Sequence, residues 1–265
     1  MTPLIYFTES TLSLSKNFDP DWITENKVRA NVLILGGEYV NMGAFPRVRL
    51  IYRFGVGAEN IPAFPHSQIV FPSREARNIL YDSVAEFTAY MVLRGFYESY
   101  PCEDWKRNPR PLLKDIKVLI IGQGEIGWRV TKKLQEIATV TTYDIFQNKD
   151  SELYGLISNA DIISLHIPLE KTNYHFIDEQ KLLWMKNNVV LINTARGDLV
   201  DEDALYDTMN ARCGNMKCYF DVFWEEPYTG KMTEMKEFFM TPHIAGYTQA
   251  FIDKCCDDIR EMVKQ

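Results

Sequence analysis

Three residues that could act on a carboxylic acid follow one another in the second half of the chain. Arg196 stands after the apolar run Val189–Asn193, Glu226 precedes a proline, and His243 comes after a further apolar run. A guanidinium can hold a planar carboxylate through two hydrogen bonds. A histidine beside a glutamate can carry a proton near neutral pH, because the carboxylate fixes its tautomer and favours its charged form. The trio predicts proton transfer to or from a bound acid.

Each of these residues also has a structural interpretation. Arg196 could cap the next helix or pair with Asp198 or Asp201, Glu226 alone could be a solvated loop acid, and a lone histidine is more often structural. Their order along the chain is what favours the catalytic interpretation.

A glycine turn before the trio predicts a phosphate-binding cradle. Gly122-x-Gly124-x-x-Gly127 follows the apolar run 118–121 and opens a helix. The first glycine permits the tight turn, the second lets a pyrophosphate approach the backbone, and the third lets the helix lie close to the strand. The helix dipole and its free amides would then attract the phosphates. The predicted cradle consists of Gly122, Gln123, Gly124, Glu125, Ile126 and Gly127; a turn that only packs a helix on a sheet is the alternative.

Two further residues sharpen the cofactor prediction. Asp144 ends the next strand, 20 residues after Gly124, where a carboxylate would bind the adenosine ribose and repel a 2′-phosphate. Ile145 and Phe146 beside it offer no arginine for such a phosphate, so NAD is preferred over NADP. His166, at another strand end, is expected to line the cofactor.

The elements that position these residues alternate between apolar strands and helices from Ile116 onward. Such strands, with almost no polar alternation, indicate a parallel sheet covered on both faces. The strands expected here are 118–121, 139–143, 161–165, 189–193, 217–220 and 238–241. The helices expected here are 126–137, 178–185, 202–210 and 249–264. Before Ile116 the expected strands are 4–7, 31–35, 49–52 and 68–71. A helix is expected over 84–100, with Asp82 or Ser83 as its cap.

Composition excludes several classes of protein. The net charge of −7 argues against a nucleic-acid partner. The apolar runs are all well short of the roughly 20 residues of a membrane helix, and the N-terminus reads as a first strand, not a signal peptide. The five cysteines are odd in number and without framework spacing, which favours reduced thiols, a cytoplasmic setting and no metal site.

Four segments in the second half together resemble the D-isomer-specific 2-hydroxyacid dehydrogenase family. They are His166–Leu169, 182–200 with Asn193–Gly197 inside it, Asp221–Pro227 and Thr241–Ile244, and the similarity extends from about Val48 to the C-terminus. The resemblance implies that Arg196 binds the substrate carboxylate and carbonyl. It also implies that His243 exchanges a proton with the substrate oxygen and that Glu226 supports it.

The resemblance assigns further contacts. Asp221 matches the residue that holds the nicotinamide carboxamide, and the segment 53–60 resembles the loop whose amides, at Val56 and Gly57, receive the carboxylate beside Arg53. The cofactor contacts expected from the matching segments are His166, Pro168, Thr194, Ala195, Asp221 and His243.

The family's architecture implies an α/β fold of two Rossmann-like domains. A doubly wound parallel-sheet NAD-binding domain is expected over 88–245. A smaller flavodoxin-like substrate domain is expected over 1–87, completed by the C-terminal helix 246–265. The substrate domain is shorter than is usual in the family, with one strand–helix unit reduced to Gly36–Arg47. Gly36-Gly37-Glu38 stands where phosphoglycerate dehydrogenases often have an arginine, which weakens a phosphorylated-substrate interpretation.

The function expected is reversible interconversion of a small 2-oxo acid and its D-2-hydroxy acid with NAD. Glyoxylate, hydroxypyruvate, pyruvate-like acids and 3-phosphohydroxypyruvate all stay open as substrates. A homodimer through the NAD-binding domain is expected, with no nucleic-acid or membrane partner. The alternatives are a non-enzymatic NAD(H)-sensing corepressor-like protein and a degenerate binding protein of the same fold.

Overall fold

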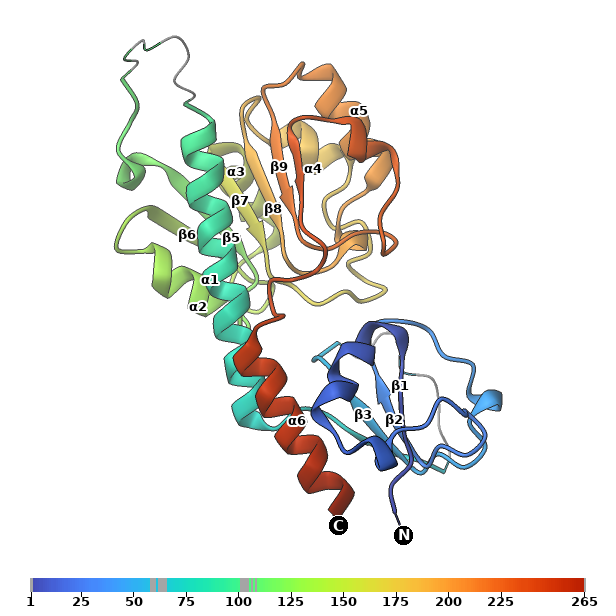
Figure 1. Ribbon diagram of the computed structural model, residues 1–265. Helices are drawn as coiled ribbons and strands as arrows, with labels where there is room; N and C mark the ends of the chain where they lie inside the picture. The colour runs from blue at the N-terminus through green and yellow to red at the C-terminus, as the bar shows by residue number, and fades with distance from the viewer. Residues whose placement is uncertain are drawn as a thin grey trace. The chain divides into compact units, whose positions relative to one another are not determined.

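The computed structural model describes residues 2–57, 61, 66–100, 105, 107 and 109–264. The chain divides into two compact units, one of Met1–Leu80 with Tyr247–Gln265 and one of Tyr81–Gly246. Each unit has its own sheet of parallel strands (Figure 1), which confirms the predicted α/β class. Among the described residues, no helix is both long enough and apolar enough to cross a membrane.

The sheet of the second unit has six parallel strands in the order β10-β9-β8-β7-β5-β6. Their bounds are β5 (Lys117–Ile121), β6 (Thr139–Tyr143), β7 (Ile162–Leu165), β8 (Val190–Asn193), β9 (Lys217–Phe220) and β10 (Phe238–Met240). Strand β5 pairs with β6 on one side and with β7 on the other, so the strand order reverses there. In open α/β sheets, ligands bind beyond the carboxyl ends of the strands at such a reversal.

Helices cover both faces of this sheet. They are α1 (Arg74–Glu98), α2 (Gly127–Leu134), α3 (Asp150–Asn159), α4 (Glu179–Trp184) and α5 (Glu202–Ala211). Val118 and Ile120 of β5 pack in one cluster with α1 and α2, and α1 runs along the sheet in Figure 1. Leu119 and Ile121 point to the other face and pack with α3, α4 and α5. The apolar residues of one strand thus fill two cores, which explains the absence of polar alternation.

The predicted start of the long helix is wrong, because α1 begins ten residues earlier. Asp82 and Ser83 lie inside it, whereas Ser73 provides the cap: its Oγ accepts the amide of Ala76 at 3.2 Å. Ala76 and Leu80 are buried and belong to the apolar face of α1. In the sequence, Asp82 and Ser83 separate them from the rest of that face. Helix α3 was not predicted, since Gly155 and the charges around Asp150 hide its two buried positions, Leu153 and Ile157.

The first unit has a four-stranded parallel sheet in the sequential order β1-β2-β3-β4. Its strands are β1 (Ile5–Phe7), β2 (Val32–Leu35), β3 (Leu50–Arg53) and β4 (Gln68–Val70). The connection between β1 and β2 carries the 3-10 helices Glu9–Asn17 and Pro20–Trp22, and the one between β2 and β3 has only the 3-10 turn Met42–Ala44. The C-terminal helix α6 (Gln249–Lys264) belongs to this unit. Tyr52 donates a hydrogen bond to Asp258 of α6 at 3.3 Å, and Arg260 donates to the carbonyl of Asn17 at 2.7 Å.

Candidate active site

The predicted cofactor cradle lies where β5 ends and α2 begins. Gly122 has a φ of +98°, and a Cβ there would lie 2.4 Å from the carbonyl oxygen of His166. A Cβ on Gly127 would lie 1.9 Å from the carbonyl oxygen of Gly122, so the helix approaches the turn more closely than any side chain permits. A Cβ on Gly124 would meet nothing within 4 Å. The backbone at Gly124 therefore faces open space, as a cradle for a pyrophosphate requires.

The end of β6 contributes the acid that the sequence predicted for the ribose. Asp144 Oδ2 accepts the amide of Gln123 at 2.8 Å, and its Oδ1 accepts the amide of Phe146 at 2.9 Å. The carboxylate is thus fixed against the cradle by backbone amides. Phe146 and Ile145 are exposed beside it. These residues fit NAD. The Asp144 carboxylate can bind the ribose hydroxyls, and the apolar side chains beside it offer no cation for the 2′-phosphate of NADP.

His166 lies under the cradle, at the end of β7. Its Nε2 hydrogen-bonds Ser164 Oγ at 2.9 Å, and its backbone amide donates to Ile121 at 2.7 Å. Burial lowers the pKa of His166 to about 3. The ring is therefore neutral at physiological pH, in keeping with a lining role. Pro168 follows in the same loop, and its carbonyl accepts from Asn173 at 2.5 Å.

The turn that carries Arg196 follows β8 and is shaped by Asn193. The side chain of Asn193 donates to the carbonyl of Arg196 at 2.7 Å and accepts the amide of Ala195 at 3.0 Å. Thr194 is buried and hydrogen-bonds Thr88 of α1 at 3.0 Å. None of these three hydrogen bonds was predicted from the sequence, although an asparagine ahead of a turn often bonds the backbone of that turn through its side chain.

Glu226 and His243 form the predicted pair. His243 Nδ1 lies 2.8 Å from Glu226 Oε2, and Glu226 Oε1 accepts the amide of Phe223 at 3.2 Å. Their side chains are 51% and 40% exposed, so a substrate can reach the ring. The backbone of His243 has a φ of +53°, a conformation that is costly for a residue with a side chain and that is concentrated at functional sites.

Asp221 holds the loop that presents His243. Its Oδ1 accepts from the Thr241 hydroxyl at 2.5 Å and the Ile244 amide at 2.9 Å, and its Oδ2 accepts the Ala245 amide at 2.8 Å. The residue is 1% exposed, and burial raises the pKa of Asp221 against the opposing effect of these hydrogen bonds. The contact with a nicotinamide carboxamide stays a prediction; the role that the contacts show is support of the loop.

The loops carrying Arg196 and Glu226 lie against each other. A Cβ on Gly197 would lie 2.1 Å from the carbonyl carbon of Phe223, and the amide of Asp221 donates to the carbonyl of Asn193 at 3.0 Å. The carboxyl ends of β8, β9 and β10 therefore bring the predicted trio to one edge of the sheet, the same edge at which β5 presents the cradle.

The predicted substrate loop belongs to the first unit. Arg53 is buried at the end of β3 and donates from Nε to the carbonyl of Gly57 at 2.8 Å. Val56 and Gly57 are partly exposed, and Gly55 has a φ of +119°. Arg53 therefore supports the loop that it was expected to accompany. Residues 58–60 of the family-like segment lie outside the described residues.

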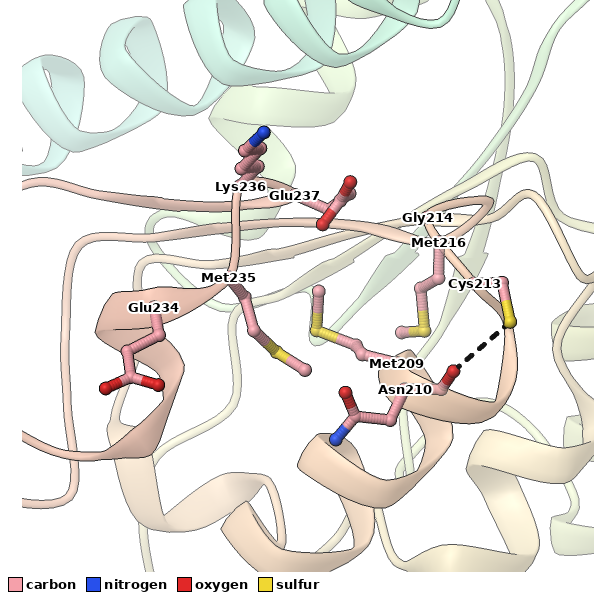
Figure 2. Close-up of a pocket in the computed structure, with 9 residues that line it drawn as sticks. All are labelled: Met209, Asn210, Cys213, Gly214, Met216, Glu234, Met235, Lys236 and Glu237. Carbon is pink, nitrogen blue, oxygen red and sulfur yellow. Dashed lines mark hydrogen bonds between the residues drawn. The ribbon is translucent and has the colours of Figure 1, made fainter.

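A separate cavity lies at the opposite end of the sheet, before β9 and β10. Figure 2 shows Met209, Met216 and Met235 gathered around it, with Cys213 Sγ 3.5 Å from the carbonyl of Asn210. Its lining residues are all different from the predicted site residues. Within the described ranges, no cluster of three or more His, Cys, Asp or Glu residues could hold a metal ion.

Residues 88–245 match the family described as D-isomer specific 2-hydroxyacid dehydrogenase, NAD binding domain. A glyoxylate reductase from Thermofilum pendens is 31% identical in an alignment of 232 residues that covers 78% of this chain and 68% of the relative. An (S)-sulfolactate dehydrogenase from Chromohalobacter salexigens is 34% identical in an alignment of 236 residues that covers 78% of this chain and 74% of the relative.

Solved structures show the same fold. A D-isomer specific 2-hydroxyacid dehydrogenase from Xanthobacter autotrophicus has a TM-score of 0.81 at 17% identity, and the match covers 100% of this chain and 96% of that enzyme's chain. A D-lactate dehydrogenase from Aquifex aeolicus, complexed with NAD and lactic acid, has a TM-score of 0.73 at 23% identity, with 98% and 94% covered. Together the matches confirm the resemblance, the α/β fold and the NAD-binding assignment.

Proposed function

The chain belongs to the D-isomer-specific 2-hydroxyacid dehydrogenase family, and we propose that it interconverts a small 2-oxo acid and its D-2-hydroxy acid. As a member it is an NAD-dependent oxidoreductase. The observation that carries the proposal is the His243–Glu226 pair, which is exposed, held by Asp221 and presented at the same sheet edge as the cofactor cradle. The substrate and the role of each side chain are our inference.

We propose that the cradle and Asp144 hold the cofactor and prefer NAD to NADP. A bound NAD would supply the acceptor for the hydride of the hydroxy acid, and a bound NADH would supply the hydride donor for the oxo acid. The preference for NAD is supported by the fixed carboxylate of Asp144 and by its apolar neighbours. His166, Pro168, Thr194 and Ala195 belong to loops at the carboxyl ends of β7 and β8 and would line the same site.

We propose that His243 moves the proton. Because Glu226 engages Nδ1, Nε2 is the ring atom that would donate to the substrate oxygen during reduction and accept its proton during oxidation. Glu226 fixes the tautomer and steadies the charged ring, while the amide of Phe223 orients Glu226. Asp221 holds the backbone of the His243 loop in place.

We propose that Arg196 orients the acid by binding its carboxylate. Its turn is fixed by Asn193, and a guanidinium can form two parallel hydrogen bonds with a carboxylate. The amides of Val56 and Gly57, with Arg53, would complete the substrate contacts. We also propose that residues 1–87 with 246–265 form the substrate domain and that residues 88–245 form the NAD-binding domain.

Steady-state oxidation of NADH against a panel of acids tests the proposal. The panel includes glyoxylate, hydroxypyruvate, pyruvate, 3-phosphohydroxypyruvate and, in the reverse direction with NAD, sulfolactate; the names of the relatives suggest glyoxylate first. We expect turnover with at least one unphosphorylated acid and, where the product is chiral, the D enantiomer. Tight NADH binding without turnover of any of them would instead support a cofactor-sensing protein.

We also propose a homodimer through the NAD-binding domain and a cytoplasmic setting. The cysteines Cys213, Cys218, Cys255 and Cys256 are free, which supports a reducing environment; Cys102 lies outside the described residues. Sedimentation of the purified protein tests the dimer, since a monomer at micromolar concentration would contradict it.

A further inference from the structure

A cationic side chain is enclosed beside the cofactor cradle, at the first turn of α2. Arg129 Nη1 lies 2.6 Å from Glu125 Oε2 and 2.5 Å from the Glu125 carbonyl oxygen, and Arg129 Nε lies 3.1 Å from Asp82 Oδ1. The guanidinium also lies over the rings of Trp128, at 4.6 Å, and Tyr81, at 5.4 Å. These five residues form the Arg129 cluster.

Exposure within the cluster differs sharply between its charges. The Arg129 side chain is only 11% exposed, whereas those of Glu125 and Asp82 are 61% and 59% exposed. Partial burial strengthens the attraction between Arg129 and its two carboxylates, because water screens it less than at an open surface. The arginine is therefore a fixed feature of this helix start, unlike a freely moving surface side chain.

The position of these charges is unusual for a helix start. A cation there opposes the helix dipole, which favours negative charge at the N-terminus. Glu125 suits the dipole, but it occupies the very turn that must accept a diphosphate. Helical side chains point back toward the N-terminus, which is how Arg129 reaches Glu125 one turn earlier. The Glu125 carboxylate therefore stands in a site suited to an anion, and the Arg129 guanidinium is paired with it.

We infer that Glu125 and Arg129 together set the affinity of the cradle for the cofactor's diphosphate. Glu125 weakens the binding of an anion, and Arg129 offsets that repulsion by neutralising the carboxylate and adding its own attraction. Asp82 and the two rings are positioning residues that keep the guanidinium at the cradle. The inference rests on the proposed use of NAD and deepens it.

Charge-changing variants test the inference through binding of NADH and ADP, measured by calorimetry on the full chain. Glu125→Gln keeps the shape of the side chain and removes its repulsion, so both compounds should bind roughly 3- to 10-fold more tightly. Arg129→Met removes the cation and leaves the carboxylate, so binding should weaken about tenfold or more. Arg129→Lys keeps the charge and should stay much closer to wild type than Arg129→Met.

Adenosine is the matched control compound because it lacks the diphosphate. Its affinity should be unchanged in Glu125→Gln, and the gain for ADP should shrink as salt is raised. Asp82→Asn removes a carboxylate outside the cradle that positions Arg129, so it should not tighten ADP binding as Glu125→Gln does. Thermal unfolding of each variant monitors the fold, and Glu125→Gln tests the sign even where Arg129→Met folds poorly.

The sign of the Glu125→Gln effect decides the matter. An ion pair that only stabilises the helix predicts unchanged or weaker binding of ADP and adenosine alike. If wild type binds NADH and Glu125→Gln gives no tighter binding, this inference is wrong and the proposed function stands. If wild type does not bind NADH at all, the proposed function fails, and the inference fails with it.

Discussion

The proposed cofactor cradle and the proposed proton-transfer pair, Glu226 with His243, lie at one edge of the same sheet but are built by opposite means. The cradle works through missing side chains: Gly122 and Gly127 are packed against backbone, and Gly124 faces open space. The pair works through side chains that are present: Glu226 holds the ring of His243, and Asp221 holds its backbone. The cradle should therefore fail when an atom is added, and the pair should fail when one is removed.

The largest expected effect is on the pair. His243→Ala removes the only group proposed to exchange the substrate proton, so kcat should fall by roughly 10²–10⁴-fold. NADH affinity should change much less than kcat, because the cradle is left intact and only the one predicted cofactor contact of His243 is lost. Steady-state kinetics with the best acid of the panel, together with NADH titration, measures both quantities.

His175 offers a matched control. It too has a left-handed backbone, with a φ of +53°, and its Nδ1 lies 3.3 Å from a carboxylate oxygen of Asp201. His175→Ala should leave kcat within a few-fold of wild type. Glu226→Gln should fall between the two, with a loss on the order of 10- to 100-fold, because the ring loses its orientation. Near-normal kcat in His243→Ala would contradict the assignment of the acid–base group.

The second prediction adds one methyl group to the cradle at two positions. Gly127→Ala places a Cβ 1.9 Å from the carbonyl oxygen of Gly122, so strand and helix must separate. The unfolding free energy should drop by about 1–3 kcal/mol or more, the cost of overpacking. Gly124→Ala meets nothing within 4 Å, so its stability should stay near wild type while its affinity for NADH falls.

Thermal unfolding and NADH titration of both variants separate packing from binding. If Gly124→Ala binds NADH as wild type does, the backbone at Gly124 is not where the diphosphate approaches. If Gly127→Ala is as stable as wild type, the close packing of α2 on the turn contributes little.

These two regions also differ in how much of them the sequence reveals. The cradle is encoded by local spacing on one strand, turn and helix, so its six residues could be predicted together. The partnership of Glu226 and His243 could be predicted from residue types and order. The support by Asp221 could not, because two of its acceptor bonds go to backbone amides 23 and 24 residues away, and any residue type offers an amide.

Dependence on tertiary structure also explains the other features that could not be predicted from the sequence. The start of α1 was missed because the true cap, Ser73, precedes a run that Asp82 and Ser83 interrupt with polar side chains. Arg129 reads as an ordinary surface residue of α2, since only the tertiary structure brings Asp82 to it. Hydrogen bonds to backbone amides and ion pairs between residues far apart in the sequence depend on how the elements pack. Residue types alone do not specify that packing.

A smaller effect is expected from Asp221→Asn. The amide cannot accept at both ends, so one buried donor, the amide of Ala245 or of Ile244, loses its partner. A buried unsatisfied donor costs about 1–3 kcal/mol, which should appear as a lower unfolding temperature. Because the loop presenting His243 then loosens, kcat should fall; a weaker NADH affinity beside it would reflect the predicted contact with the nicotinamide carboxamide. An unchanged kcat would mean that the loop does not depend on this carboxylate.

The smallest effect concerns His166, which lies beside the cradle and whose ring can bind a proton. Burial lowers its pKa from 6.5 to about 3, so between these values the unfolded chain binds a proton that the folded chain does not. Stability should therefore fall as the pH drops below 6.5, by up to about 1.4 kcal/mol per pH unit from this residue. His166→Gln keeps a hydrogen-bonding side chain for Ser164 and removes the titration. The unfolding temperature of the variant should thus fall less than that of wild type between pH 7 and pH 5, and parallel curves for the two proteins would show that the ring is not held neutral beneath the cradle.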